Sequence, residues 1–301
     1  MKKLNAWILA GILFALLPGA CSKDSGPAPE LVEKIRVKSY AEDGVSVSYG
    51  YNSKHYLSRY HISEMGGESA VQYDAQNRIL RNATMNFTYN ESGQISKIKY
   101  DDGDYASDVE GTFQYNGSGQ LIMSAHQYIL RDHPVSRYTR TYEYDAQNQL
   151  IMVNEIPDDT QFLLEYDSRG NVSKVKTRRK SIFAGSFADV ETVTFTYDDK
   201  KNPDKLTLEL MGIKGNFSLV HIPIYSKVRL GFNSYFNLHY FGDYNIVKLK
   251  RELAGTGATV YEYSYTYNEQ GYPTASEVKR TNPDGTVRNY RYTWEYETYL
   301  E

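Results

Sequence analysis

The strongest constraint on this chain is a short turn motif that recurs along it. Each copy has a Tyr, then Asp or Asn, two variable residues, usually Gly or Asn, one more residue, and usually Ile, Leu or Val. Copies begin at seven tyrosines: Tyr73, Tyr89, Tyr115, Tyr144, Tyr166, Tyr197 and Tyr267. Because such a motif specifies chain reversals and carries no reactive group of its own, it predicts an architecture and not an activity.

The copy from Tyr89 to Ile95 shows how the motif predicts a hairpin. Asn90 is an Asx residue, which accepts a hydrogen bond from the backbone just beyond it. Gly93 supplies the left-handed conformation that closes a three-residue loop with a bulge. Tyr89 and Ile95 are then expected opposite each other on one face of the sheet. A cross-strand pair of this kind stabilises a sheet by about 0.2–1 kcal/mol.

The other copies keep the left-handed slot with one exception. Asn77 and Asn148 replace Gly in two of them, and Asn tolerates a positive φ better than most residues. Gly fills the slot in three more, as Gly119, Gly170 and Gly271. The copy at Tyr197 is degenerate, because it is followed by Asn202 and a proline, and a weaker echo of the motif begins at Tyr51.

Strict alternation predicts β-strands on both sides of these turns. Tyrosines occupy every second position from Tyr261 to Tyr267, and Tyr290 to Tyr296 repeats the pattern with a Trp. No stretch after the leader shows a convincing helical stripe. The sequence therefore predicts an all-β fold, a long up-and-down antiparallel meander of hairpins that is curled or barrel-like. Its length suggests about fourteen to sixteen strands, and it leaves a closed barrel and an open curled sheet as alternatives.

The strand faces do not match a membrane-spanning pore. Outer-membrane barrels need an outward apolar band with aromatic belts only at its rims. Here tyrosines run the full length of strands, and the alternate positions are polar or charged, as in Arg137, Thr139 and Glu143. We expect both faces to contact protein or water.

The N-terminus is typical of an exported bacterial lipoprotein. Residues 1–20 start with two lysines, continue with an apolar stretch too short to span a membrane, and end in small residues directly before Cys21. Cys21 is the only cysteine, and lipoprotein processing would attach lipid to its thiol. The alternative is an ordinary secretion signal with an incidental Cys.

Residues 21–32 form a short flexible tether, and residues 33–301 a single β domain with an insert at about 203–243. Removal of Lys2 and Lys3 with the leader takes the formal net charge from −3 to −5. An acidic chain is a poor partner for nucleic acid, so we expect none.

The repeat resembles the YD repeat of RHS proteins and teneurins. Together with the leader and the length, the chain is similar to a family of uncharacterised lipoproteins from Bacteroides-type bacteria, whose domain of unknown function is described as having a porin-like β fold. The resemblance covers roughly Glu33 to Tyr299. It implies an outer-membrane lipoprotein on the periplasmic or cell-surface side, and it transfers no catalytic residue.

The insert is the best place to expect a ligand site. It is rich in aromatic side chains, which could line a pocket or simply plug the space that a curled sheet leaves empty. The candidate ligand-binding residues are Tyr225, Phe232, Tyr235, Phe236 and Tyr240.

Other chemistry has weaker support. No nucleophile elbow or phosphate-binding Gly loop is present, and the six histidines lack zinc-ligand spacing. The acidic turn around Asp101, Asp102 and Asp104 is more typical of a solvated loop than of a Ca²⁺ site. We expect no cofactor or metal and no enzymatic activity.

Three functions remain as hypotheses. The first is a non-enzymatic lipoprotein that binds a glycan, a peptide or a partner protein in the envelope. The second is a carbohydrate-active enzyme of a new type, which requires two carboxylates facing one cleft. The third is an envelope scaffold whose sheet edge pairs with another protein.

Overall fold

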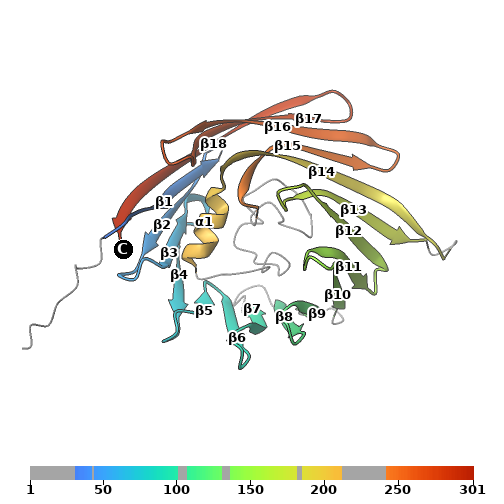
Figure 1. Cartoon of the computed structure of the whole chain (residues 1–301), viewed down its shortest axis with the longest axis horizontal. Coiled ribbons are helices and arrows are strands. Elements are labelled where there is room, and N and C mark those ends of the chain that lie inside the picture. Colours follow the sequence, from blue (N-terminus) through green and yellow to red (C-terminus); the bar gives the residue numbers. More distant parts are fainter. Residues whose placement is uncertain (1–30, 43, 101–106, 131–135, 182–184, 212–241) are drawn as a thin grey trace, which may run out of the picture.

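The structure, a computed structural model, describes residues 31–42, 44–100, 107–130, 136–181, 185–211 and 242–301. These residues form one antiparallel sheet of 18 strands, in which each strand pairs with the next and β18 pairs with β1. The sheet is therefore a closed up-and-down barrel (Figure 1). The all-β meander is confirmed, and the strand count of fourteen to sixteen was too low because the two ends of the chain also pair.

The bounds of the elements follow the hairpins. In chain order the strands are β1 Glu33–Glu42, β2 Val45–Tyr51, β3 Leu57–Ile62, β4 Glu68–Tyr73, β5 Ile79–Asn82, β6 Met85–Tyr89, β7 Ile95–Tyr100, β8 Ser107–Tyr115, β9 Leu121–Leu130, β10 Ser136–Tyr144, β11 Leu150–Ile156, β12 Thr160–Tyr166, β13 Val172–Lys180, β14 Phe187–Lys201, β15 Tyr244–Leu253, β16 Gly257–Tyr267, β17 Pro273–Thr281 and β18 Val287–Leu300. A 3₁₀ turn, η1 Ser63–Met65, follows β3, and one helix, α1 Pro203–Leu210, follows β14.

The predicted turn geometry is confirmed in the repeats. In the turn after Tyr89, the Asn90 amide donates to the Gln94 carbonyl at 2.8 Å and the Gly93 amide to the Asn90 carbonyl at 3.0 Å. Tyr89 and Ile95 are cross-strand partners. All six predicted slot residues have a positive φ between 60° and 85°: Asn77, Gly93, Gly119, Asn148, Gly170 and Gly271.

The echo at Tyr51 is a complete turn. His55 holds the left-handed slot with φ 65°, and Tyr51 pairs with Leu57. The Asn52 side chain accepts hydrogen bonds from the amides of Lys54 and Tyr56, as the Asx residue does in the other copies. The motif was hard to see here because His stands where Gly or Asn is expected.

The copy at Tyr197 is not degenerate but opened by an insertion. Tyr197 pairs with Ile246, so the Tyr–aliphatic pair is kept across the insert. The Asp198 carboxylate accepts from the Lys200 amide at 2.9 Å and from the Asn245 amide at 3.1 Å, the bonds that close an ordinary copy. Residues 201–244 therefore stand where the other copies have a single left-handed residue.

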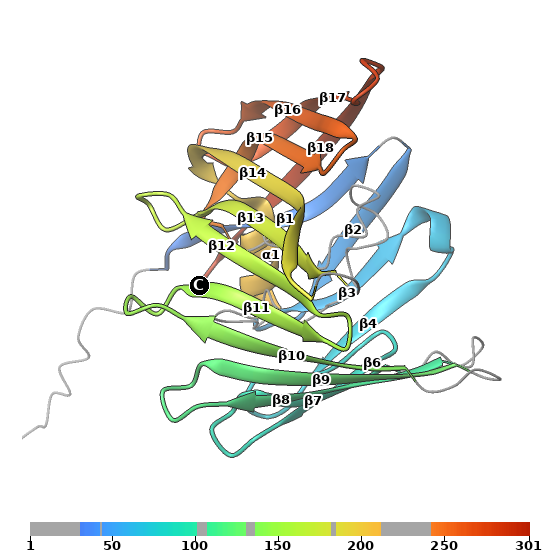
Figure 2. The same ribbon diagram turned by 90° about the vertical axis from the view of Figure 1, so that its right-hand side faces the viewer.

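The insertion begins with α1, which the sequence did not predict. Asn202 caps the helix, since its side chain accepts from the Asp204 amide at 2.9 Å, and Pro203 takes the first helical position. Leu208 and Met211 are buried. At eight residues the helix is too short to show a helical period. In both views α1 lies within the outline of the barrel (Figure 1, Figure 2).

The two termini complete the ring. Val37 of β1 pairs with Tyr296 of β18, which is a ninth Tyr–aliphatic pair made by the ends of the chain. Val32 and Glu301 exchange two backbone hydrogen bonds at 3.0 and 3.1 Å just beyond it. Both termini of the described chain thus lie at the rim formed by the repeat turns, which we name the turn rim.

A second bond joins each hairpin to its neighbour at the turn rim. The backbone ladder of β7 and β8 ends at the pair of Lys97 and Thr112, and the Tyr115 hydroxyl then donates to the Ile95 carbonyl at 2.8 Å. Nine such bonds of 2.5–3.0 Å circle the barrel: Tyr51 to Val37, Tyr73 to Leu57, Tyr89 to Ile79, Tyr115 to Ile95, Tyr144 to Leu121, Tyr166 to Leu150, Tyr197 to Val172, Tyr265 to Ile246 and Tyr296 to Pro273. We name this set the tyrosine ring.

The side chains of the tyrosine ring are partly buried, and burial changes the pKa values of their hydroxyls. The pKa values of Tyr89, Tyr115, Tyr144 and Tyr166 are raised to about 12, mainly because burial disfavours the charged phenolate. These tyrosines therefore keep their protons, and their donated hydrogen bonds, throughout the physiological range of pH.

The outward face of the barrel is charged, and the inward face is apolar. The basic run of residues 174–180 lies on β13 and pairs with acids of neighbouring elements, as in Lys174 with Glu165 at 2.6 Å and Lys176 with Asp189 at 3.1 Å. Lys174, Lys176 and Arg178 alternate with the buried Val175 and Thr177, so the charged side chains of this run lie on the outward face. Within the described residues, the one helix is far too short to cross a membrane.

The turn after Tyr115 offers a matched pair of glycines for testing the turn code. Gly119 has φ +83°, whereas Gly117 has an ordinary φ and open space around its Cα. We expect Gly119→Ala to lower the free energy of unfolding by about 1 kcal/mol, because an L-residue is strained there. Gly117→Ala should leave it unchanged or raise it by about 0.4–1 kcal/mol. Urea denaturation measures both, and equal effects of the two variants would contradict the role assigned to the left-handed slot.

Candidate functional site

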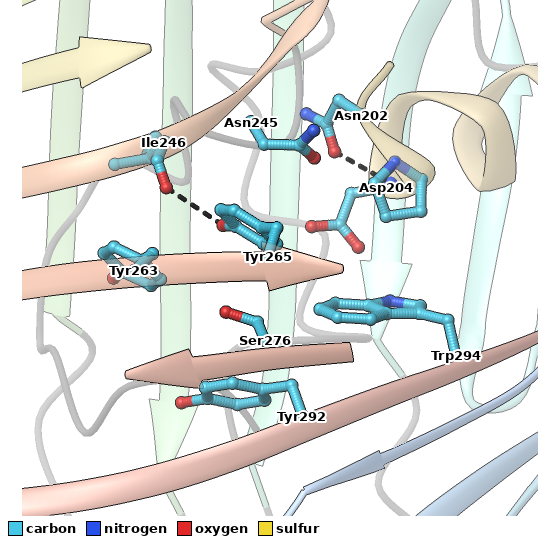
Figure 3. A pocket seen from close by; sticks show the side chains of 10 residues that line it. Asn202, Asp204, Asn245, Ile246, Tyr263, Tyr265, Ser276, Tyr292 and Trp294 are labelled. Atoms are coloured by element: carbon cyan, nitrogen blue, oxygen red, sulfur yellow. Dashed lines mark hydrogen bonds between the residues drawn. The ribbon is translucent and has the colours of Figure 1, made fainter. Parts of the chain in front are cut away.

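A cavity lies inside the barrel, against the inner face of β15 to β18 and next to the start of α1 (Figure 3). Its volume is about 70 Å³. The lining residues come from five elements and the turn before α1: Asn202, Pro203, Asp204, Asn245, Ile246, Tyr263, Tyr265, Ser276, Tyr292 and Trp294. We name it the lumen cavity.

One wall of the lumen cavity is an aromatic surface. Tyr263 and Tyr265 lie on β16 with their rings 6.2 Å apart and nearly parallel, at 6°. Tyr292 and Trp294 lie on β18 with ring centroids 6.4 Å apart. Strand alternation explains the arrangement, because residues two apart point to the same face.

Contacts with the neighbouring strands β1 and β15 hold this aromatic surface in place. Tyr40 of β1 stacks on Tyr292 with ring centroids 6.1 Å apart and contacts Trp294 at 5.6 Å. The Tyr265 hydroxyl belongs to the tyrosine ring and donates to the Ile246 carbonyl at 2.9 Å (Figure 3). Because these contacts join β18 to β1 and β16 to β15, the aromatic rings are positioned before any ligand enters.

Ser276 forms the gap between the aromatic residues. It is the cross-strand partner of both Tyr265 and Tyr292, and its small side chain leaves the space that a larger residue would fill. Ser276 is only 1% exposed, and its hydroxyl has no hydrogen-bond partner in the part of the chain that the structure describes. A buried polar group without a partner costs about 1–3 kcal/mol, so a native structure that keeps one requires an explanation.

The opposite wall is polar and comes from the two ends of the insertion. Asn202 is the helix cap, and its side-chain amide donates to the Gly242 carbonyl at 3.0 Å. Asn245 is the closing residue of the opened turn, and its side-chain amide donates to the Asp198 carboxylate at 3.3 Å. Asp204, at the first turn of α1, adds a carboxylate whose side chain points toward the cavity (Figure 3).

Asp198 organises this wall from outside the cavity. In the hairpin of β16 and β17, Tyr265 is the residue whose hydroxyl belongs to the tyrosine ring. Tyr267, two residues later, donates its hydroxyl to the Asp198 carboxylate. The pKa of Tyr267 is raised, first by burial and then by this bond to a carboxylate. Asp198 thereby fixes both Tyr267 and Asn245 in place.

A larger cleft opens at the turn rim, between α1 and the strand ends. Its volume is about 630 Å³, and both signs of charge line it. Lys34 forms an ion pair with Glu301, and the Lys201 ammonium lies 5.2 Å from the centre of the Tyr272 ring. We name it the rim cleft. Its mixed charge favours no single class of ligand.

A Ser–His contact elsewhere in the barrel has the spacing of a nucleophile and its base but not the access. The His126 Nε2 atom is 3.0 Å from the Ser124 hydroxyl, which is also 2.8 Å from the Tyr142 hydroxyl. Ser124 is completely buried. Next to it, Arg140 and Glu155 form a buried ion pair with a closest N···O distance of 2.6 Å. We interpret this cluster as a structural polar network.

The predicted site residues fall elsewhere in the chain. Cys21 and the five candidate ligand-binding aromatics, Tyr225, Phe232, Tyr235, Phe236 and Tyr240, lie outside the described residues, so these predictions stand as predictions. Among the residues that are described, no group of three His, Cys, Asp or Glu side chains could hold a metal ion.

Sequence reasoning recognised the cavity strands but not the cavity. It placed Tyr263, Tyr265 and Tyr292 on strand faces, and Trp294, the only Trp after Trp7, could have been singled out. Ser276 and Asp204 carry no signal of their own, because their role depends on which strands and which helix end meet.

No family model and no curated protein matches the sequence. Similar solved structures include a porin-like protein from Bacteroides uniformis, with a TM-score of 0.43, 14% identity, and coverage of 87% of this chain and 98% of that one. Another is a porin-like protein from Bacteroides vulgatus, with a TM-score of 0.45, 14% identity, and coverage of 88% and 99%. The TcdB2–TccC3 structure has a TM-score of 0.33 and 12% identity, and the similarity covers 82% of this chain but 15% of that one. Likeness at this level assigns no function.

Two buried serines allow a test of the unpaired hydroxyl. We expect Ser276→Ala to raise the free energy of unfolding by about 1 kcal/mol, because it removes a buried polar group that has no partner. Ser124→Ala should lower it by about 1–3 kcal/mol, since it removes a buried hydroxyl that hydrogen-bonds to both Tyr142 and His126. Chemical denaturation measures the free energy of unfolding of both variants. An equal loss in the two would show that the Ser276 hydroxyl is already hydrogen-bonded.

Proposed function

We propose that the chain is a lipid-anchored protein of the bacterial cell envelope and that its barrel is a non-enzymatic binding module. The ligand is a glycan, a peptide or a partner protein, and a small group of that ligand enters the lumen cavity. One observation carries this proposal: the cavity combines four fixed aromatic rings with a buried hydroxyl that has no hydrogen-bond partner among the described residues. Apolar walls with a few convergent polar groups are typical of ligand sites.

The position of the termini supports the anchor. Leu31 begins the described chain at the turn rim, ten residues after Cys21. Ten extended residues span at most about 35 Å. A lipid on Cys21 would therefore hold the turn rim toward the outer membrane, with the opposite rim facing the periplasm or the exterior.

The enzyme hypothesis has less support at the lumen cavity. Hydrolysis of a glycosidic bond by paired acids requires two carboxylates on one cleft. Asp204 is the single carboxylate among the described residues that line the lumen cavity. The rim cleft contains three, on Glu33, Glu209 and Glu301, so a carbohydrate-active enzyme remains the alternative there.

The scaffold hypothesis requires a different surface from the one expected. It assumed a free sheet edge, and β1 pairs with β18, so no described strand has an unpaired edge along the barrel. Pairing with another protein through a sheet edge therefore has no free edge to use among the described strands. A structural role would have to use the outward face or a rim.

The anchor is tested by the substitution Cys21→Ser. The wild-type chain should partition into the membrane fraction and incorporate labelled palmitate, because its thiol carries the lipid. The variant should be recovered in the soluble envelope fraction without label. Ser22→Ala, which keeps the thiol, is the control. A variant that stays with the membrane would contradict the proposed anchor.

The cavity is tested with a chain that begins at Ser22, in which Trp294 is the only tryptophan. A panel of sugars and short peptides should include at least one compound that changes its fluorescence saturably. Asp204→Asn should weaken that binding about tenfold or more in calorimetry, since a hydrogen bond to a charged group is lost.

Asp199→Asn is the matched control, because Asp199 is close in sequence but its side chain is 77% exposed. Binding that neither alters Trp294 nor depends on Asp204 would place the ligand outside the lumen cavity.

A further inference from the structure

The Ser276 hydroxyl limits the chemistry of what enters the lumen cavity. It is buried between Tyr265 and Tyr292 and lines the cavity, and it has no partner in the described part of the chain. On the inward face of β17, Ser276 lies between the fully buried Pro273 and Val278. A buried hydroxyl between two apolar residues is explained by a ligand atom that can donate to it or accept from it.

The polar wall of the lumen cavity also favours a ligand that can donate and accept hydrogen bonds. Asn202 and Asn245 present amides and Asp204 a carboxylate, so the polar wall combines donors and acceptors. A ligand with several hydroxyls matches both kinds, because each hydroxyl can donate and accept. A negatively charged ligand would be repelled by the Asp204 carboxylate.

The aromatic wall requires that the ligand also have an apolar face. Tyr263, Tyr265, Tyr292 and Trp294 offer ring faces and no charge. Such faces attract organic cations as well as the C–H surface of a sugar ring. A quaternary methylammonium group, however, has no N–H and cannot hydrogen-bond, so it would leave the Ser276 hydroxyl unpaired. A site built to bind a hydroxyl discriminates strongly against a ligand that lacks one.

The volume sets how much of the ligand enters. At about 70 Å³ the cavity holds one edge of a sugar ring, since a water molecule takes about 30 Å³. A cavity of this volume is too small for an internal unit of a polymer together with the two units linked to it. The volume thus favours the free end of a chain or a single sugar.

We propose that the lumen cavity binds the edge of a neutral terminal sugar, with its C–H face on the aromatic wall and one of its hydroxyls hydrogen-bonded to Ser276. This inference rests on the proposed function, because it names the ligand class of the same cavity. Ser276 is then the residue that reads one hydroxyl position and so determines which sugar binds.

The experiment uses calorimetry on the chain that begins at Ser22. The probes are the methyl glycosides of glucose, galactose, mannose and N-acetylglucosamine, with tetramethylammonium as the cation and glucuronate as the anion. At least one glycoside should bind more tightly than tetramethylammonium and glucuronate. Ser276→Ala should weaken it about tenfold. Ser264→Ala, an exposed position on the outward face of β16, should leave the affinity unchanged.

A deoxy series identifies the hydroxyl. One deoxy glycoside should bind the wild-type protein as weakly as the parent glycoside binds Ser276→Ala. The Ser276→Ala protein should bind this deoxy glycoside and the parent glycoside equally well. Glycoside binding that Ser276→Ala does not change would overturn the role of Ser276. Preference for tetramethylammonium would overturn the sugar class, and preference for glucuronate would overturn the neutral charge of the sugar; either would leave the proposed function intact. No binding by these probes, and none in the wider Trp294 screen, would sink both.

Discussion

The barrel depends on a single hydrogen bond that is made nine times, from a tyrosine hydroxyl to a carbonyl beyond the end of a backbone ladder. Neighbouring hairpins separate at the turn rim, as β7 and β8 do after Lys97 and Thr112. An unpaired carbonyl would oppose folding there, and the long phenol of the next repeat reaches it. In eight of the nine hairpins one Tyr thus closes its own hairpin and links it to the preceding one, and the nine linking tyrosines are nine of the 29 in the chain.

The same device explains where the candidate site lies. The seventh turn keeps its Tyr197–Ile246 pair and its Asp198 carboxylate bonds, so an insertion could open it without breaking the ring. The insertion directs α1 into the lumen and leaves Asn202 and Asn245 at its two ends. These residues face the aromatic strands β16 and β18. An opened turn therefore provides the polar wall, and intact repeats provide the aromatic one.

Turn chemistry was readable because it is local. Gly93 and Asn148 reveal a left-handed residue by their identity alone, and the spacing of Tyr89 and Ile95 fixes the register. The reading failed where identity misleads: His55 occupies the same conformation without being Gly or Asn. It also failed at Tyr197, since its closing residue Asn245 lies far along the chain and only the folded structure brings it to Asp198.

By itself the sequence determined the hairpins, their register and the all-β class, because each turn is specified within seven residues. It also determined the charged and aromatic alternation of the strands. Only the tertiary structure decided that the sheet closes and that eighteen strands form it. It also decided that Ser276 is buried between two tyrosines with no hydrogen-bond partner in the described part of the chain. Closure and cavity depend on contacts between residues distant in sequence, such as Val37 with Tyr296, and no local pattern encodes those contacts.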